Sequence, residues 1–295
     1  MPGWSDVFDE ISIAAQINPH DYVRGKYLKK LHEHTKRNVI CYYSAFLTKT
    51  GDNLSIRDSD MTGFMNAVKD IDTSLGLDLI LHTPGGSPMA AEAIVNYLRS
   101  KFGTNIRIIV PQIAMSAGTM IACAGKEIVM GNQSSLGPID PQVFGKAAFN
   151  IKKEYEDAKA ELLTNPASAE YWSMLLGKYP PAMIYDCMNA IELSTELATK
   201  WLLSGMFKGK SSAEKKAAKV VSWLNQNTES KNHGRHFDKQ TCKNNGLKIV
   251  DLETNGMDEF QDLILSLHHS YMLLFANVGA SKIIENHKRK AFVVN

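Results

Sequence analysis

Four short apolar runs alternate with segments of helical periodicity between residues 38 and 130, and this alternation leaves few possible folds. The runs are Asn38–Ser44, Asp78–His82, Ile106–Val110 and Glu127–Met130, and helical patterns over 58–70, 88–102 and 116–124 separate them. Strands that alternate with helices in this way pair in parallel, and the helices cover the faces of the sheet. The sequence therefore predicts an α/β fold with a mainly parallel sheet.

The composition changes past residue 145, where helical patterns predominate. We expect helices over 149–163, 167–177, 181–208 and 211–226, a further strand over 247–252 and a closing helix over 259–276. The chain of 295 residues is predicted to be one domain, with no internal repeat. Its core would lie at about 38–145 and 230–252, its helical region at about 146–228, and its closing helix and tail at 257–295.

The composition describes an ordinary globular protein. Hydrophobic residues make up 44% and charged residues 22%, with a formal net charge of +2, so nothing calls for a nucleic-acid partner. The four scattered cysteines lack CxxC spacing and indicate buried free thiols in a reducing compartment. The amino terminus lacks a secretory pattern, and the longest apolar run, 108–124, is interrupted by polar residues, so we expect a cytoplasmic protein without a membrane span.

Two segments, Leu79–Pro88 and Pro111–Met120, each lead from a buried strand into a helix through small residues. The first contains Gly85-Gly86, whose backbone N–H groups could stabilise a developing oxyanion, and the second contains Ser116, a candidate nucleophile. Adjacent parallel strands would bring both to the same edge of the sheet, where α/β folds bind ligands. From these residues alone, Ser116 could equally be a helix cap, and Pro-Gly-Gly could be an ordinary turn.

The residues from about Leu79 to Gln142 resemble the core of the Clp protease and signal peptide peptidase A superfamily, which has a crotonase-like fold. The resemblance is strongest to its soluble serine dehydrogenase proteinase group. The motifs that carry it are His82-Thr-Pro-Gly-Gly-Ser87, Ala91-Glu-Ala-Ile94, Ser116-Ala-Gly-Thr-Met-Ile-Ala122, Ser135-Leu-Gly-Pro-Ile-Asp-Pro-Gln142 and, at the carboxyl end, Ser270-Tyr-Met and Ile283-Ile-Glu-Asn-His287.

This resemblance implies a serine peptidase that acts without ATP on peptides or unfolded protein segments, in a homo-oligomeric chamber. It implies Ser116 as the nucleophile and the backbone N–H groups of Gly86 and Ala117 as the oxyanion hole. Gly85 and His82 would lie at the margin of the site.

The residue that would accept the proton of Ser116 differs from that of the better-known relatives. Clp proteases carry a histidine in the segment that matches Leu136–Gln142, and here that segment holds Asp140 and no histidine. Signal peptide peptidases use a later lysine, which favours Lys146 or Lys152 as the base. Such a lysine must be desolvated, because its ordinary pKa of about 10.4 keeps it protonated.

Four other residues have alternative interpretations. Asp140 could orient a base, hold its loop or contact a partner subunit, and we favour the loop-holding role. The ring of His82 is expected to bond to a neighbouring loop. His233 and His236, in a polar loop, could supply a distant base in the order Ser, Asp, His.

No metal or cofactor is expected, because His233 and His236 with Cys242 lack zinc spacing and neither a Walker loop nor GxGxxG occurs. Two competing functions remain open. One is a crotonase-type acyl-CoA hydratase or lyase, which would need carboxylates such as Glu92 and Asp140 over the site. The other is a catalytically silent subunit that assembles through the helical half.

Overall fold

A seven-stranded sheet forms the centre of the computed structural model, which describes residues 3–14, 18–225, 232–253 and 258–295. The strand order is β10-β5-β3-β2-β1-β11-β12. In sequence these strands are β1 (Asn38–Ser44), β2 (Leu77–His82), β3 (Ile106–Val110), β5 (Glu127–Met130), β10 (Ile249–Asp251), β11 (Lys282–Asn286) and β12 (Ala291–Val294). The five strands from β10 to β1 pair in parallel, which confirms the predicted α/β class.

The remaining two strands differ from the prediction. Residues 282–294, where we expected a tail, form β11 antiparallel to β1 and then β12 antiparallel to β11. The strand β11 contains Lys282, Glu285 and Asn286, which break any apolar pattern, yet all three are buried. The charges of Lys282 and Glu285 are paired with Asp60 and Arg24, far away in the sequence, so local periodicity could not reveal the strand.

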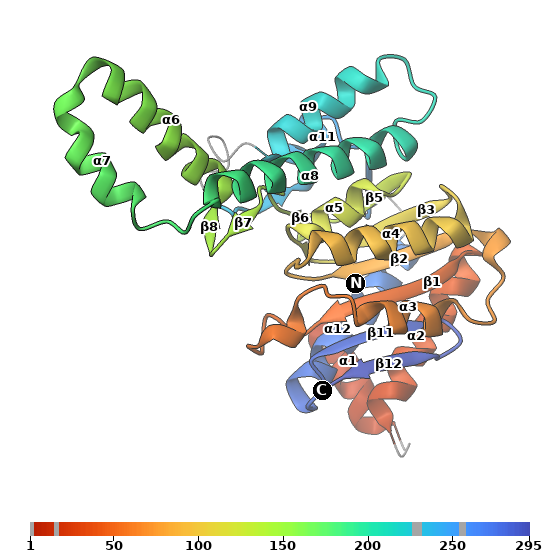
Figure 1. Cartoon of the computed structure of the whole chain (residues 1–295). Coiled ribbons are helices and arrows are strands. Elements are labelled where there is room, and N and C mark those ends of the chain that lie inside the picture. Colours follow the sequence, from red (N-terminus) through yellow and green to blue (C-terminus); the bar gives the residue numbers. More distant parts are fainter. Residues whose placement is uncertain (1–2, 15–17, 226–231, 254–257) are drawn as a thin grey trace.

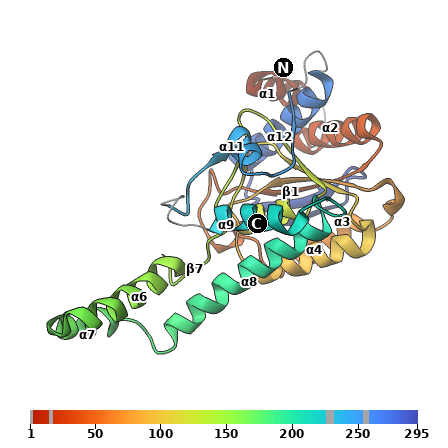
Figure 2. The same ribbon diagram turned by 90° about the horizontal axis from the view of Figure 1, so that it is seen from above.

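Helices cover both faces of the sheet, and Figure 2 shows the strands between the two layers. One layer contains α3 (Asp60–Val68), α4 (Pro88–Phe102) and α5 (Ala117–Cys123), and the other contains α1 (Trp4–Ile13), α2 (Pro19–Thr35) and α12 (Asp258–Asn277). Successive residues of β1 alternate between the two cores: Tyr42 belongs to the α4 side, and Cys41 and Tyr43 belong to the α12 side. Burial on both faces explains why the parallel strands are continuous apolar runs.

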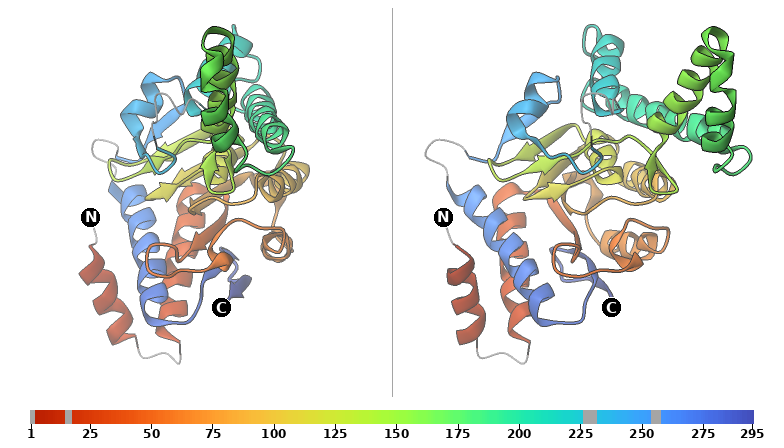
Figure 3. Two further views of the ribbon diagram at one scale, coloured as in Figure 1. Left: turned by 60° about the vertical axis from the view of Figure 1, so that its left-hand side comes forward. Right: turned by 90° about the vertical axis from the view of Figure 1, so that its left-hand side faces the viewer.

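The helical region has two parts. Its first part, α6 (Ala148–Thr164) and α7 (Ala169–Leu176), extends away from the body as an arm (Figures 1 and 3). Its second part consists of α8 (Met183–Ser204), whose amino-terminal half packs on α6, and α9 (Ala213–Asn225). The carboxyl-terminal half of α8 packs on α5, and Trp201 is fully buried there. The four predicted helices are therefore present within a few residues of their expected bounds.

A smaller, three-stranded sheet was not predicted. It consists of β4 (Ile113–Ala114), β6 (Ser135–Leu136) and β9 (Phe237–Asp238), with β6 in the middle. A two-stranded hairpin, β7 (Gln142–Val143) and β8 (Lys146–Ala147), then leads into α6, and α11 (Lys239–Asn244) follows β9. Two-residue strands are too short to leave a periodic signal, but these three join segments that are distant in the sequence.

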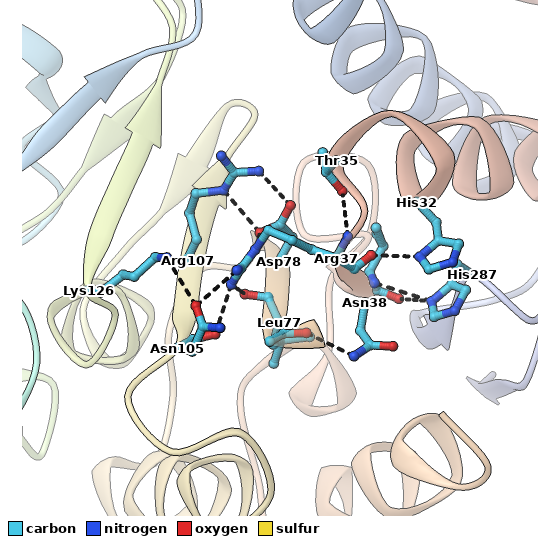
Figure 4. A network of polar contacts seen from close by, with 12 residues as sticks. His32, Thr35, Arg37, Asn38, Leu77, Asp78, Asn105, Arg107, Lys126 and His287 are labelled. Carbon is cyan, nitrogen blue, oxygen red and sulfur yellow. Dashed lines mark hydrogen bonds and ion pairs between the residues drawn. The ribbon is translucent and has the colours of Figure 1, made fainter. Parts of the chain in front are cut away.

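A polar network closes the amino ends of the parallel strands, opposite the loops that carry Ser116 (Figure 4). The carboxylate of Asp78 is fully buried and lies 2.6 Å from Nε of Arg37 and 2.6 Å from Nη2 of Arg107. Arg37 also donates to the backbone oxygens of Leu77 and Asn105. Two guanidinium groups thus compensate one buried carboxylate and tie the beginnings of β1, β2 and β3 together.

Candidate active site

Ser116 lies in a strained turn between β4 and α5. Its backbone has φ 52° and ψ −118°, a region that residues with a side chain rarely adopt. It occupies the N-cap position of α5, but its hydroxyl makes no capping hydrogen bond. The capping interpretation of Ser116 therefore lacks its expected bond, and the geometry is that of a nucleophile elbow.

The Gly85-Gly86 turn is held by the backbone of Ile56. The N–H of Ile56 donates to the carbonyl oxygen of Gly85 at 2.7 Å, and the N–H of Ser87 donates to the carbonyl oxygen of Ile56 at 2.9 Å. In such a pairing, alternate residues point their polar groups in opposite directions. The N–H of Gly86 therefore points away from Ile56, and no backbone hydrogen bond among the described residues uses it.

The two segments singled out in the sequence are in contact. A Cβ built on Gly85 would lie 2.7 Å from Cβ of Ser116 and 3.2 Å from the backbone nitrogen of Ala117. Only a glycine, at φ 100°, allows this approach. The N–H of Ala117, like that of Gly86, donates to no backbone acceptor in the described part of the chain. The N–H of Ala117 thus lies at the contact with Gly85, and the N–H of Gly86 belongs to the next residue of the same turn, so both are candidates for an oxyanion hole.

Asp140 and His233 form a pair behind this turn. The carboxylate of Asp140 is fully buried, and its Oδ1 lies 2.7 Å from Nδ1 of His233. Its Oδ2 accepts a hydrogen bond from Nε2 of Gln142 at 3.0 Å. The side chain of His233 is 30% exposed, so its ring faces the solvent-accessible side of the pair.

The small sheet explains how three distant residues meet. β4 ends just before Ser116, β6 ends just before the loop of Asp140, and β9 begins just after the loop of His233. Since β6 pairs with both β4 and β9, the three loops leave the same sheet together. Sequence reasoning could find the order Ser, Asp, His, but not this pairing.

Ser116 and His233 line one cavity of about 350 Å³. Gly85, Gly86 and Ala117 line it as well. The remaining walls are mostly apolar and come from the segments before α3, α4 and β7, from β7 itself, from α4 and α5, and from α8: Ser55, Pro84, Pro88, Met120, Ile139, Pro141, Gln142, Ala190, Leu193 and Ser194. The arrangement can hold a chain segment against the serine and stabilise a negative oxygen next to it.

The two lysines predicted as bases lie outside this cavity lining. Lys146 is exposed on β8, and Lys152 pairs with Glu156 on the surface of α6 at 3.5 Å. Glu92, the carboxylate considered for a hydratase, is also absent from the lining and lies 3.6 Å from Lys200. None of these side chains is brought to Ser116.

His82 points away from the cavity into the core on the α12 side. Its ring packs against Tyr43, Phe46 and His268. Burial lowers the pKa of His82 to about 3, and the backbone of Ile113 offsets this only in part. The expected full hydrogen bond from its ring to a neighbouring loop is not formed.

His236, the other candidate in the polar loop, bonds elsewhere. His236 directly precedes β9, and its Nδ1 lies 2.7 Å from the hydroxyl oxygen of Ser135 in β6. His236 does not line the cavity.

Two properties of the described residues concern metal ions and membranes. No group of three or more histidine, cysteine, aspartate or glutamate side chains could hold a metal ion there. None of the helices in those ranges has the length and apolar character needed to cross a membrane.

Comparison with known proteins adds a family. Residues 22–166 match the family model described as ClpP-like SDH-type serine proteinase. The chain is 38% identical over 108 residues to uncharacterized protein MJ0137 of Methanocaldococcus jannaschii. These residues make up 37% of this chain and 37% of the relative. It is 35% identical over 102 residues to uncharacterized protein MJ1495 of the same organism, which is 35% of this chain and 34% of the relative. The matched stretches thus span about a third of these curated relatives.

Proposed function

Since residues 22–166 belong to the ClpP-like SDH-type serine proteinase family, which implies the ClpP and crotonase type of fold, we propose that this protein is a serine peptidase. The observation that carries the proposal is the common cavity of Ser116 and His233, with His233 bonded to the buried Asp140. Residues 233 and beyond lie outside the matched segment, so this pairing is independent support for the function.

In the proposed reaction, Asp140 accepts the Nδ1–H of His233 and so fixes the tautomer whose Nε2 is free to take a proton. Nε2 removes the proton of the Ser116 hydroxyl as its oxygen attacks the carbonyl carbon of a peptide bond. The negative oxygen of the tetrahedral intermediate receives hydrogen bonds from the N–H groups of Gly86 and Ala117.

The same histidine completes the cycle. His233 gives its proton to the leaving amine, and the acyl group remains on Ser116. His233 then takes a proton from a water molecule as the water oxygen attacks the ester carbon. When the bond from that carbon to Oγ of Ser116 breaks, His233 gives the proton to Oγ and the carboxylic acid product leaves. This assignment replaces the lysine base by a histidine, because Lys146 is exposed, Lys152 is paired with Glu156, and both lie outside the cavity lining.

We further propose peptides or unfolded segments as substrates and a homo-oligomer as the working form. The cavity is open enough to admit a chain segment, and its walls are mostly apolar. The arm carries exposed large apolar side chains, among them Leu163, Tyr171 and Met174, which a second copy could cover. We expect the protein to work in the cytoplasm. We also expect it to work without ATP, since its sequence has no Walker loop.

Labelling with a fluorophosphonate probe tests the proposal. We expect wild-type protein to be labelled at Ser116 and Ser116→Ala not to be labelled. Ser55 lines the same cavity, so Ser55→Ala is the matched control and should retain labelling. Wild-type protein that neither reacts with the probe nor cleaves unfolded protein would contradict the proposal and favour the silent-subunit alternative.

A further inference from the structure

The oxyanion turn depends on a segment that has no regular structure of its own. Gly85 and Gly86 have φ 100° and 148°, a region that glycine adopts without steric cost and that other residues rarely adopt. The two backbone bonds to Ile56 fix the direction of the Gly86 N–H, and the N–H of Gly85 also donates to Oγ1 of Thr83 at 3.2 Å. Ile56 lies between a one-turn 3₁₀ helix, Asp52–Leu54, and α3, so its position depends on contacts outside regular secondary structure.

Lys282 of β11 holds this segment from behind. Its Nζ donates to the backbone oxygen of Ser55 at 2.7 Å, one residue before Ile56. The same Nζ lies 2.7 and 2.9 Å from the two carboxylate oxygens of Asp60. Both side chains are fully buried, so neither charge is screened by water.

Asp60 extends the brace to the other side of the segment. Its Oδ2 accepts hydrogen bonds from the backbone N–H of Arg57 at 3.1 Å and from the hydroxyl of Tyr42 at 2.8 Å. The residues on both sides of Ile56 are thus anchored to one buried ion pair. β11 in turn is fixed to the sheet, because Lys282 pairs with Ser44 of β1.

We propose that Lys282, together with Asp60, is a positioning residue of the oxyanion hole. The pair fixes Ser55 and Arg57, these fix Ile56, and Ile56 aims the Gly86 N–H at the reacting carbonyl. Neither side chain touches substrate. The inference deepens the proposed function and rests on it, since it assigns a role to residues behind the same site.

The test removes the pair without leaving a lone buried charge. The double variant Lys282→Met with Asp60→Asn is compared with wild type for the hydrolysis of an unfolded protein and for hydrogen exchange at residues 54–57 and 85–87. We expect kcat to fall roughly 100-fold, as for the loss of one oxyanion donor, with KM changed less than threefold. Exchange at the amides of Ile56 and Ser87 should become faster, while Lys282→Arg should recover part of the activity.

A second buried ion pair on the same strand gives a matched control. Glu285 faces the opposite side of β11 and pairs with Arg24, and both side chains are buried. The double variant Arg24→Met with Glu285→Gln should lower the melting temperature yet keep kcat within threefold and leave the exchange of Ile56 and Ser87 unchanged. A purely structural role for Lys282 would make both double variants behave alike.

The outcomes separate the two proposals. A folded Lys282→Met and Asp60→Asn variant with wild-type kcat, or with unchanged exchange at Ile56 and Ser87, overturns the positioning role and leaves the peptidase intact. A control variant that loses kcat equally also overturns it. Wild-type protein without hydrolysis or probe labelling overturns the proposed function itself, and the positioning role with it.

Discussion

Nδ1 of His233 lies 2.7 Å from Oδ1 of Asp140, although the two residues are 93 positions apart. The carboxylate is buried, and its other oxygen is occupied by Gln142. A buried carboxylate on Nδ1 holds an imidazole in one tautomer and one orientation. This relationship turns a residue first interpreted as a loop anchor into the orienting member of a proposed catalytic group.

Asp140→Asn should therefore abolish most activity without unfolding the protein. An amide can hydrogen-bond to His233 in the wrong tautomer, and the equivalent change in serine proteases lowers kcat by about 10⁴. The measurement is steady-state hydrolysis of an unfolded substrate, with circular dichroism to verify the fold. Activity within tenfold of wild type would show that Asp140 does not orient the base.

The lysine alternatives provide the comparison for this experiment. Lys146→Ala and Lys152→Ala remove side chains that lie outside the cavity lining, so we expect kcat to stay within about twofold of wild type. A loss of 100-fold or more in either variant, with His233→Ala still active, would return the role of base to a lysine.

Gly86→Ala should damage both the fold and the reaction. A Cβ on Gly86 would lie 2.4 Å from the backbone nitrogen and oxygen of Ile56, at a φ of 148° that alanine rarely adopts. We expect the free energy of unfolding to fall by more than about 1 kcal/mol and kcat to fall strongly. Gly51 has φ 134° with nothing within 4 Å, so Gly51→Ala isolates the backbone strain and should keep kcat. Equal losses of kcat in the two variants would refute the role of the close contact with Ile56.

Ser116→Gly should stabilise the protein relative to Ser116→Ala. The backbone at φ 52° and ψ −118° costs a residue with a Cβ roughly 1–3 kcal/mol, and glycine relieves this strain while its own unfolded chain is more flexible. We expect a net gain of about 1 kcal/mol in the free energy of unfolding, measured by urea denaturation. Both variants should be inactive. A less stable Ser116→Gly variant would argue that the turn is not strained.

His82 should make the protein sensitive to acid. Its pKa is lowered by burial to about 3, whereas in the unfolded chain it is about 6.5. Neutral His82 makes its full contribution to the free energy of unfolding above pH 6.5. This contribution is lost as the pH falls toward 3, because His82 of the unfolded chain takes up a proton at a higher pH than His82 of the folded chain. The free energy of unfolding should fall by about 1.4 kcal/mol per pH unit from this residue alone.

His82→Phe checks this sign and slope. Neither ring nitrogen of His82 makes a well-formed hydrogen bond within the described residues, so phenylalanine loses at most the weak contact with the backbone of Ile113. Below pH 6.5, the slope of the unfolding free energy against pH should become smaller by about 1.4 kcal/mol per pH unit, which corresponds to one proton. Phe46 packs on the same ring, and Phe46→Leu should change stability while keeping the wild-type slope. An unaltered slope in His82→Phe would assign the acid sensitivity to other groups.

The parallel part of the fold could be predicted because its strands are buried on both faces. Ile106–Val110 and Glu127–Met130 have in the structure the bounds that the sequence predicts, as does the helix Pro88–Phe102. The contact between Gly85 and Ser116 also followed, since parallel neighbours must end at the same edge.

The rest could not be predicted from local patterns. β11 carries Lys282 and Glu285, whose burial depends on Asp60 and Arg24, far away in the sequence. The resemblance to signal peptide peptidases favours a lysine base, and the sequence alone offers His233 and His236 only as distant alternatives. His233 reaches Asp140 through the small sheet, whose two-residue strands leave no signal.

The antiparallel position of β11 beside β1 affects how the chain is made. During synthesis, β1, β2 and β3 leave the ribosome long before β11, so one edge of β1 waits without its partner strand. An unpaired strand edge is a template for pairing with other chains until its partner strand arrives. Ser116 and His233 also emerge before Lys282 does. On the proposed role of that lysine, a growing chain holds its reactive groups before it can aim them, and cleavage is postponed until the sheet has closed.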